Sequence, residues 1–420
     1  MFKVNPSIRK ITFSTAIIWI CGILIIFKMN PYFSMTTFLS GKLSFLPVFA
    51  MGGFLGLTFL IILKSRIGYK KLYLTFFIIL IYILNNTIPY YTVTLQQAGN
   101  YLLVIAFLLI PITTQGKIWN AFSWIFAISL IPGIIIMILL SLGINLPSQV
   151  LVPESSITAS RVYFNNYFFA INMHSYTSGT QNVLQGIFDE RGVVGTFAVL
   201  FLVADEYKLK GNIKNIIIFL SGILSLSLAF IVITGIYLVF RLLKRHNWKS
   251  LAKIVLIFVL YMMFIKIDFS NPYLIYVQDR IEIIDGQLSG DNRVTPLFDE
   301  AYSQYMHGDT VNVLFGYGIG TASQNTAIAG SSSYKIAIID YGYIGFSLIV
   351  LWFSATILLL FENKFSIILF LLVFIVSLYQ RPNVMNIAYM VALFGGAANL
   401  AIKKYNISQG LDRNIEYGIE

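Results

Sequence analysis

Apolar stretches about as long as a membrane-spanning helix recur along the whole chain, with short polar segments between them. A helix needs about 20 mainly apolar residues to cross a bilayer. We therefore expect an all-α, polytopic integral membrane protein in which residues 1–420 form one membrane domain. The pattern predicts twelve spans, and counts of ten and eleven stay open because the stretches between 192 and 243 are short. The predicted spans are 11–27, 43–63, 72–88, 98–112, 118–142, 192–204, 215–229, 231–243, 250–267, 336–360, 365–380 and 385–402.

Two segments between predicted spans, 143–191 and 268–335, are too long to be simple connectors. Long ordered loops in compact proteins usually carry function, so we expect an active site in the second of these external loops. Apolar positions spaced three and four apart predict an amphipathic helix over 274–288. It lies either on the membrane–water boundary or against the protein's own spans. Thr295 and Pro296 predict the start of another helix, and the glycines of 316–320 predict a turn.

Composition narrows the class of protein. Hydrophobic residues make up 57% of the chain and charged residues only 11%. Soluble domains have about 25% charged residues, so a soluble enzyme, a disordered chain and a nucleic-acid-binding domain are excluded. The single cysteine, Cys21, lies inside an apolar stretch and is expected to be a small buried hydrophobic residue. It excludes a disulfide framework and a cysteine-based metal site.

Charged residues separate into two sets along the chain. Twenty of the 29 lysines and arginines lie at the termini or in alternate connecting segments, and twelve of the 18 acidic residues lie in the others. Cytoplasmic loops of membrane proteins are rich in Lys and Arg, so this pattern places both termini in the cytoplasm. The net charge of +11 then reflects orientation in the membrane, and no nucleic-acid partner is expected.

The cations on the external side are mainly arginines, namely Arg161, Arg191, Arg280, Arg293 and Arg381. The planar guanidinium group matches the geometry of phosphate oxygens. Basic residues are more frequent on the cytoplasmic side of membrane proteins, so arginines on the external side run counter to that preference. One interpretation is that they bind a pyrophosphate at the outer membrane surface. The alternative is that they form ion pairs with nearby acidic residues, such as Asp189, Glu190, Asp279 and Asp291.

Candidate bases near these arginines are Glu190, Asp189, Asp291 and His307, and the sequence does not choose among them. A histidine titrates near neutral pH, although a lone loop histidine is commonly a polar surface residue. The aromatic residues of 163–168 either stack on sugar rings or anchor the chain at the membrane interface. No group of His, Asp or Glu has the spacing of metal ligands, so neither a metal nor a cofactor is expected.

Four stretches of the sequence resemble the O-antigen polymerase (Wzy) and O-antigen ligase superfamily. They are FDERGVVGTF at 188–197, LSLSLAFIVITG at 224–235, LSGDNRVTPLFDEAY at 288–302, and LFGYGIGTASQ with SSSYKIAIIDYGYIGFSLIV within 314–350. Each motif is loose, and their order and spacing, together with many spans and a long late loop, carry the resemblance. By motif it covers roughly 185–350, and by topology the whole chain.

The resemblance implies a multi-pass enzyme of the cytoplasmic (inner) membrane with an external or periplasmic active site. Such an enzyme joins oligosaccharide repeats carried on undecaprenyl pyrophosphate, without a metal, to make O-antigen, capsule or exopolysaccharide. Its partners would be this lipid-linked donor, membrane lipid, a flippase and a chain-length regulator. It implies that Arg191, Arg293 and Glu190 are catalytic. It implies substrate binding by Arg280, Arg161, Arg381, Asp291, His307 and Tyr334.

Two departures from the family pattern bear on the choice of branch. The Ser-Arg pair usual in the central short spans is absent, and Ser225 to Leu228 stand there instead. The His-Asn pair that ligases typically carry after the glycine-rich loop is replaced by Ser331 to Tyr334. These differences favour a polymerase, with an O-antigen ligase and a lipid-linked oligosaccharide flippase or transporter as the alternatives.

Overall fold

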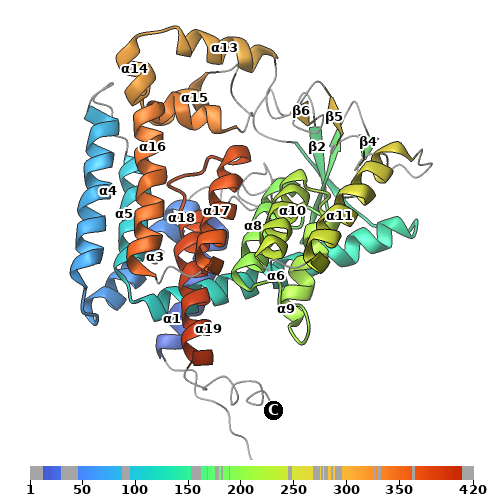
Figure 1. The fold of residues 1–420 in the computed structure, drawn as a ribbon, viewed down its shortest axis with the longest axis horizontal. Helices are drawn as coiled ribbons and strands as arrows, with labels where there is room; N and C mark the ends of the chain where they lie inside the picture. The colour runs from blue at the N-terminus through green and yellow to red at the C-terminus, as the bar shows by residue number, and fades with distance from the viewer. Residues whose placement is uncertain are drawn as a thin grey trace, which may run out of the picture.

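The fold is known from a computed structural model (Figure 1). The structure describes residues 13–29, 46–87, 95–152, 162–167, 169–175, 179–180, 183–188, 190–244, 248–267, 275, 278, 282–284, 287–288, 296–325, 328, 333–361 and 365–408.

The described chain is mostly helical, and a helix stands at every predicted span. The first half contains α1 (Phe13–Lys28), α3 (Leu46–Leu63), α4 (Tyr69–Thr87), α5 (Leu95–Leu109) and α6 (Ile112–Ser141). The centre contains α8 (Arg191–Ala204), α9 (Ile213–Leu224), α10 (Leu228–Leu243) and α11 (Trp248–Lys266). The last part contains α16 (Tyr334–Leu360), α17 (Phe365–Gln380), α18 (Ile387–Met390), the π-helical turn η2 (Val391–Gly395) and α19 (Gly396–Ser408).

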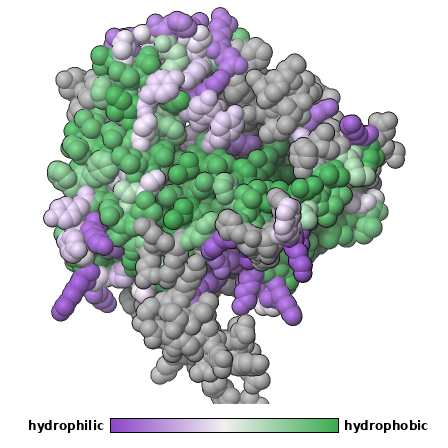
Figure 2. Space-filling model, in the orientation of Figure 1, coloured by the Kyte–Doolittle hydropathy of each residue, from purple (hydrophilic) through white to green (hydrophobic). Residues whose placement is uncertain are grey.

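Three described helices, α3, α6 and α16, are long and apolar enough to cross a membrane. The described part of the chain also contains apolar helices of only 10–17 residues, so helix length does not establish the count of twelve spans. Large apolar side chains such as Phe49, Phe76 and Leu351 are exposed on these helices. In Figure 2 hydrophobic residues form a belt between two hydrophilic edges. An apolar surface of this extent marks contact with a membrane.

The core beneath the belt is built around α8, whose residues from Gly192 to Ala204 are all buried. The rings of Phe122 and Phe126 on α6 pack against Phe197 and Phe201 on α8, with ring centroids 5.1–6.1 Å apart. Cys21 is fully buried on α1, as its apolar surroundings predict. Burial of large aromatic side chains contributes strongly to stability, so α8 is a rigid central element.

The helix ends gather at two edges of the belt. At the first edge Lys70 Nζ donates to the Leu359 carbonyl oxygen at 3.3 Å, and Lys71 donates to the Ile110 carbonyl oxygen. We call it the basic edge, and it also holds Lys214, Arg241 and Lys403. At the second edge Gln97 donates to the Ile319 carbonyl oxygen. The helix ends that the charge pattern assigns to one side of the membrane thus lie together.

A polar layer covers the second edge, which we call the capped edge (Figure 1). It consists of α13 (Pro296–Met306), α14 (Thr310–Phe315) and α15 (Thr321–Gln324). Helix α13 begins at Pro296, which confirms the helix predicted there. The glycine turn is also confirmed, because Gly316, Gly318 and Gly320 have φ angles of 94°, 100° and 91°. Side chains larger than glycine rarely adopt such angles.

The glycine turn fits into a break in helix α16. Gly342 interrupts the helix with φ 67° and ψ 172°. The amide of Tyr317 donates to the Ile339 carbonyl oxygen at 2.9 Å, and the amide of Ala322 donates to Asp340 Oδ1 at 3.0 Å. The Ile339 carbonyl oxygen, next to the break, thereby finds its donor in the polar layer. Amide groups of the polar layer therefore join it to the part of α16 that precedes the break.

Segment 143–191 carries a β-sheet, so the expectation of an all-α fold is wrong there. Four antiparallel strands lie in the order β1 (Gln149–Leu151), β2 (Val162–Asn166), β3 (Ile171–Ser175) and β4 (Gly179–Thr180). Tyr163 of β2 stands opposite His174 of β3. β-Branched and aromatic residues such as Val162 and Tyr163 favour strands, but only when a partner strand is available. Tyr163 and Phe164, two of the aromatic residues of 163–168, are thus part of a sheet.

The amphipathic helix predicted over 274–288 is wrong in its second half. Ile283–Ile284 (β5) pairs with Gln287–Leu288 (β6), and Ile284 stands opposite Gln287. Only Ile275 and Gln278 are helical among the described residues of the predicted helix. The intervening pair, Asp285 and Gly286, is a strong sequence signal for a two-residue hairpin turn. That local signal outweighed the helical spacing of the apolar positions.

Candidate functional site

An ion pair at the capped edge joins two of the predicted site residues. Glu190 precedes α8 as its N-cap residue, and Arg381 follows the end of α17. The guanidinium Nη2 of Arg381 donates to Glu190 Oε2, although the two residues lie 191 positions apart in the chain. The side chain of Arg381 is 8% exposed and that of Glu190 is 46% exposed. Arg381 is therefore a buried anchor for a carboxylate that remains open to solvent.

Arg191 stands beside this pair because it is the first residue of α8 and follows Glu190 directly. Its side chain is half-buried. The N-terminus of a helix carries a partial positive charge and amide groups that have no helical acceptor. An anion at this position would meet both the start of α8 and a guanidinium group. The sequence prediction for Arg191 is thus compatible with its place in the fold.

Tyr334, another predicted site residue, belongs to a group of tyrosines next to the ion pair. Its ring stacks on Tyr379 of α17, with centroids 5.1 Å apart and an interplanar angle of 24°. Tyr379 lies two residues before Arg381 in the sequence. The hydroxyl of Tyr302 on α13 lies 3.5 Å from that of Tyr343 on α16. We call Tyr302, Tyr334, Tyr343 and Tyr379 the tyrosine strip.

The two halves of the tyrosine strip meet at Tyr302. Burial, the hydrogen bond with Tyr343 and the nearby Tyr334 raise the pKa of Tyr302 above its usual value. Lys335 Nζ lies 5.0 Å from the ring centre of Tyr302 and forms an ion pair with Asp299 at 2.7 Å. Sequence reasoning missed Tyr302, Tyr343 and Tyr379. With 25 tyrosines in the chain, their spacing gives no signal that these belong together.

The structure does not bring every predicted residue to this place. His307 is exposed at the end of α13, and its Nδ1 lies 2.8 Å from the Ser303 carbonyl oxygen in its own helical turn. It is thus a surface residue of the polar layer in the described structure. Arg161, Arg280, Asp291 and Arg293 lie outside the described residues. Within the described residues no group of three His, Cys, Asp or Glu side chains has the arrangement of a metal site.

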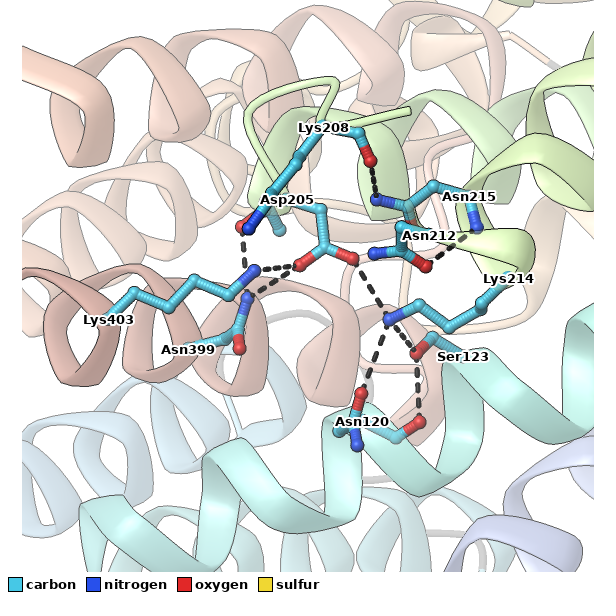
Figure 3. A network of polar contacts seen from close by, with 10 residues as sticks. Asn120, Ser123, Asp205, Lys208, Asn212, Lys214, Asn215, Asn399 and Lys403 are labelled. Carbon is cyan, nitrogen blue, oxygen red and sulfur yellow. Dashed lines mark hydrogen bonds and ion pairs between the residues drawn. The ribbon is translucent and has the colours of Figure 1, made fainter. Parts of the chain in front are cut away.

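A second polar cluster lies at the basic edge, where sequence reasoning expected only loop lysines (Figure 3). Asp205 follows the last residue of α8 and is 2% exposed. Its carboxylate Oδ2 lies 2.9 Å from Lys214 Nζ on α9, and its Oδ1 accepts from Lys403 and Asn399 on α19. Three parts of the chain that are distant in sequence meet in this cluster, namely α6, the α8–α9 region and α19, since Lys214 also reaches α6.

Lys214 is nearly as buried as Asp205, with a side chain that is 4% exposed. Its ammonium group donates to Ser123 Oγ at 3.0 Å and to Asn120 Oδ1 at 3.2 Å, as Figure 3 shows. It also lies 4.9 Å from the ring centre of Trp119. A buried ammonium group is tolerated only when it is paired and hydrogen-bonded, and both conditions are met here.

The electrostatics of this cluster favour the charged form of the carboxylate. Burial by itself would raise the pKa of Asp205, but Lys214 and Lys403 outweigh it and hold the pKa below its usual value. The following residues, Glu206 and Tyr207, both have a φ of 54°, which is rare outside glycine. Arg241 donates to the Glu206 carbonyl oxygen at 2.8 Å, and the Tyr207 hydroxyl lies 2.6 Å from Thr234 Oγ1. The turn is strained and firmly held.

The two polar clusters lie at opposite ends of the same buried helix. Arg191 begins α8 at the capped edge, and Asp205 follows its last residue at the basic edge. The Asp205 carboxylate is paired with Lys214 and Lys403 inside its own cluster, so it holds the end of α8 in position. The capped edge instead exposes a carboxylate and aromatic rings. We therefore take the capped edge as the candidate active site.

Comparison with models of protein families, with curated proteins and with solved structures found no match for this chain.

Proposed function

We propose that the protein is a polysaccharide polymerase that joins oligosaccharide repeats carried on undecaprenyl pyrophosphate, at the outer face of the cytoplasmic membrane. One observation carries the proposal: Glu190, Arg191, Arg381 and Tyr334, from three segments far apart in sequence, gather at one edge of an apolar belt. The belt offers a surface for the polyprenyl chain. The polar layer of α13 to α15 lies beside the place where a sugar and a pyrophosphate would stand in water.

The proposed reaction is transfer of a glycosyl group from a pyrophosphate to a hydroxyl. The acceptor hydroxyl oxygen forms a bond with the anomeric carbon while the bond from that carbon to the pyrophosphate oxygen breaks. The electron pair leaves with polyprenyl pyrophosphate, and Glu190 accepts the hydroxyl proton. Negative charge grows on the leaving group, and positioned cations stabilise it. Arg191 and Arg293 supply this charge, and Arg381 holds Glu190 in place.

The orientation in the membrane is part of the proposal. The basic edge is assigned to the cytoplasm because cytoplasmic loops are rich in Lys and Arg. We expect tags inserted at 210, 245 and 415 to be cytoplasmic, and tags at 165 and 300 to be external. Protease treatment of intact cells checks this, with lysed cells as the control for tag exposure. Cleavage of a tag at 245 in intact cells would contradict the orientation.

Replacement of Arg191 by Ala is expected to slow polymerisation by a factor of about 30 to 1,000. This corresponds to the roughly 2–4 kcal/mol lost when one preorganised donor to a developing anion is removed. Arg293→Ala is expected to have an effect of the same size. The measurement is the ladder of polymer lengths on a gel, from cells whose own copy of the gene is deleted and replaced by each variant.

The matched control is Arg66→Ala, which removes an exposed arginine at the basic edge. It should leave the ladder unchanged at an equal amount of protein in the membrane. Arg191→Lys tests the geometry, because an ammonium group keeps the charge but lacks the planar fork. Ladders like those of the wild type in both Arg191→Ala and Arg293→Ala would remove these residues from the mechanism.

A further inference from the structure

The tyrosine strip places aromatic rings at the capped edge, beside the ion pair of Glu190 and Arg381. The side chain of Tyr379 is 54% exposed and that of Tyr343 is 47% exposed. Both lie on helices that otherwise contribute to the apolar belt. A tyrosine ring is apolar on its faces and polar at its hydroxyl, so it suits a ligand that has both kinds of surface.

The arrangement differs from that of tyrosines that only anchor a helix at the membrane interface. Interfacial anchors are spread around both ends of a membrane protein. Here Tyr334 and Tyr379 stack face to face, and Tyr302 and Tyr343 meet through their hydroxyl groups. The four rings come from α13, α16 and α17, and Tyr302 links the two pairs because it lies near both Tyr343 and Tyr334. Convergence of rings from three helices is typical of a binding surface.

Polar groups accompany the rings. Lys335 and Asp299 form an ion pair next to Tyr302, and the carboxylate of Asp299 is half exposed. Aromatic faces carry partial negative charge and attract polarised C–H bonds, which a pyranose ring presents on its faces. Its hydroxyl groups need donors and acceptors, which Lys335 and Asp299 provide. A sugar ring therefore complements both the aromatic rings of the tyrosine strip and the Lys335–Asp299 ion pair beside it.

We propose that the tyrosine strip is a carbohydrate subsite, in which a pyranose ring of the lipid-linked oligosaccharide stacks on Tyr379 and Tyr343. This inference rests on the proposed function and names where the sugar lies. In this proposal the anomeric carbon faces the ion pair of Glu190 and Arg381, which lies at the end of α17. The Lys335–Asp299 pair hydrogen-bonds the sugar hydroxyls from the side of α13.

The test compares two lipids on the full chain, purified and placed in nanodiscs of uncharged phospholipid. One is the polyprenyl-pyrophosphate oligosaccharide extracted from cells that lack this gene, and the other is undecaprenyl pyrophosphate without sugar. For the glycolipid, Tyr379→Ala is expected to raise the dissociation constant about tenfold, which equals about 1.4 kcal/mol. Binding of the sugar-free lipid should stay within twofold of the wild type. Tyr379→Phe keeps the ring and should bind both lipids like the wild type.

Tyr73→Ala is the matched control, because Tyr73 is an exposed tyrosine on α4, remote in sequence from the strip. It should change neither dissociation constant. Equal binding of the glycolipid by Tyr379→Ala and the wild type would overturn the carbohydrate subsite and leave the proposed function standing. Equal weakening of both lipids would show that the ring contacts the lipid chain, and would also overturn the subsite. If the wild type binds neither lipid, the proposed function and this inference fall together.

Discussion

Replacing Asp205 by Asn is expected to lower the free energy of unfolding by about 3 kcal/mol. Removing one partner of a buried ion pair leaves the other charge without compensation, which usually costs about 3–5 kcal/mol. Lys214 is 4% exposed and has Asp205 as its ion-pair partner, so it would remain as a buried ammonium group beside a neutral amide. Lys403 contributes less to the loss, because its side chain is 44% exposed and water can solvate it.

The measurement is unfolding of the purified protein in detergent, followed by circular dichroism. Glu206→Gln is the matched control, because Glu206 is the neighbouring carboxylate but is exposed, with Ser366 Oγ donating to it at 2.6 Å. We expect a change below about 1 kcal/mol for this variant. Combining Asp205→Asn with Lys214→Met removes the uncompensated charge and should recover part of the loss. Equal stability of Asp205→Asn and Glu206→Gln would contradict the importance of the buried cluster.

The same cluster predicts how stability depends on pH. The pKa of Asp205 is lower in the folded protein than in the unfolded chain, where an aspartate titrates near about 3.9. Its contribution is therefore fully present above about pH 4 and is lost as the pH falls through the lower folded-state value. The difference in stability between the wild type and Asp205→Asn should shrink in that acidic range. A difference that stays constant to pH 2 would contradict this assignment.

Replacement of Gly316 or Gly342 by Ala is expected to prevent correct folding of the capped edge. A Cβ atom at Gly316 would overlap the carbonyl oxygen of Asp340, and one at Gly342 would overlap the backbone of Leu314 and Gly316. Both residues also have a positive φ, which alanine adopts only at a cost of about 1 kcal/mol. Backbone atoms cannot move aside as a flexible side chain can, so the free energy of unfolding of each variant should fall by several kcal/mol.

Gly211→Ala separates the two causes, because Gly211 has a φ of 73° but open space around its Cβ position. This variant introduces backbone strain without an overlap of atoms, so its free energy of unfolding should fall by only about 1 kcal/mol. The measurement is the yield of monodisperse protein by size-exclusion chromatography in detergent, together with the unfolding temperature. If Gly316→Ala and Gly342→Ala behave like Gly211→Ala, the glycine turn does not join the polar layer to α16 in solution.

The Asp205 cluster and the glycine turn support the candidate site and lie outside it. The Asp205 cluster holds one end of α8, and the other end begins with Arg191. The glycine turn, which connects α14 to α15, holds the polar layer against α16, whose first residue is Tyr334. Small displacements of groups that stabilise a transition state cost large factors in rate. Variants at either support should therefore lower polymer length when they remain folded.

Local features were predicted well because their causes are local. The helix at each apolar stretch follows from the length and apolar composition of that stretch, and the start of α13 follows from Pro296. The glycine turn follows from three glycines within five residues. The strand pairing between Ile283 and Leu288 was not predicted, although the sequence of Asp285 and Gly286 favours a two-residue hairpin turn. The sheet of 149–180 was not predicted, because a strand is stabilised by pairing with other strands that its own sequence does not identify.

The sequence by itself determined that the chain is a helical membrane protein with a helix at each apolar stretch, while the side of the membrane on which each helix end lies stays a prediction. Only the tertiary structure decided which polar groups meet. The pairing of Glu190 with Arg381, the contacts of Asp205 with Lys214 and Lys403, and the tyrosine strip all join residues on different helices. Apolar length and charge act on each segment separately, whereas these contacts exist only after helices pack side by side and remove the same groups from water.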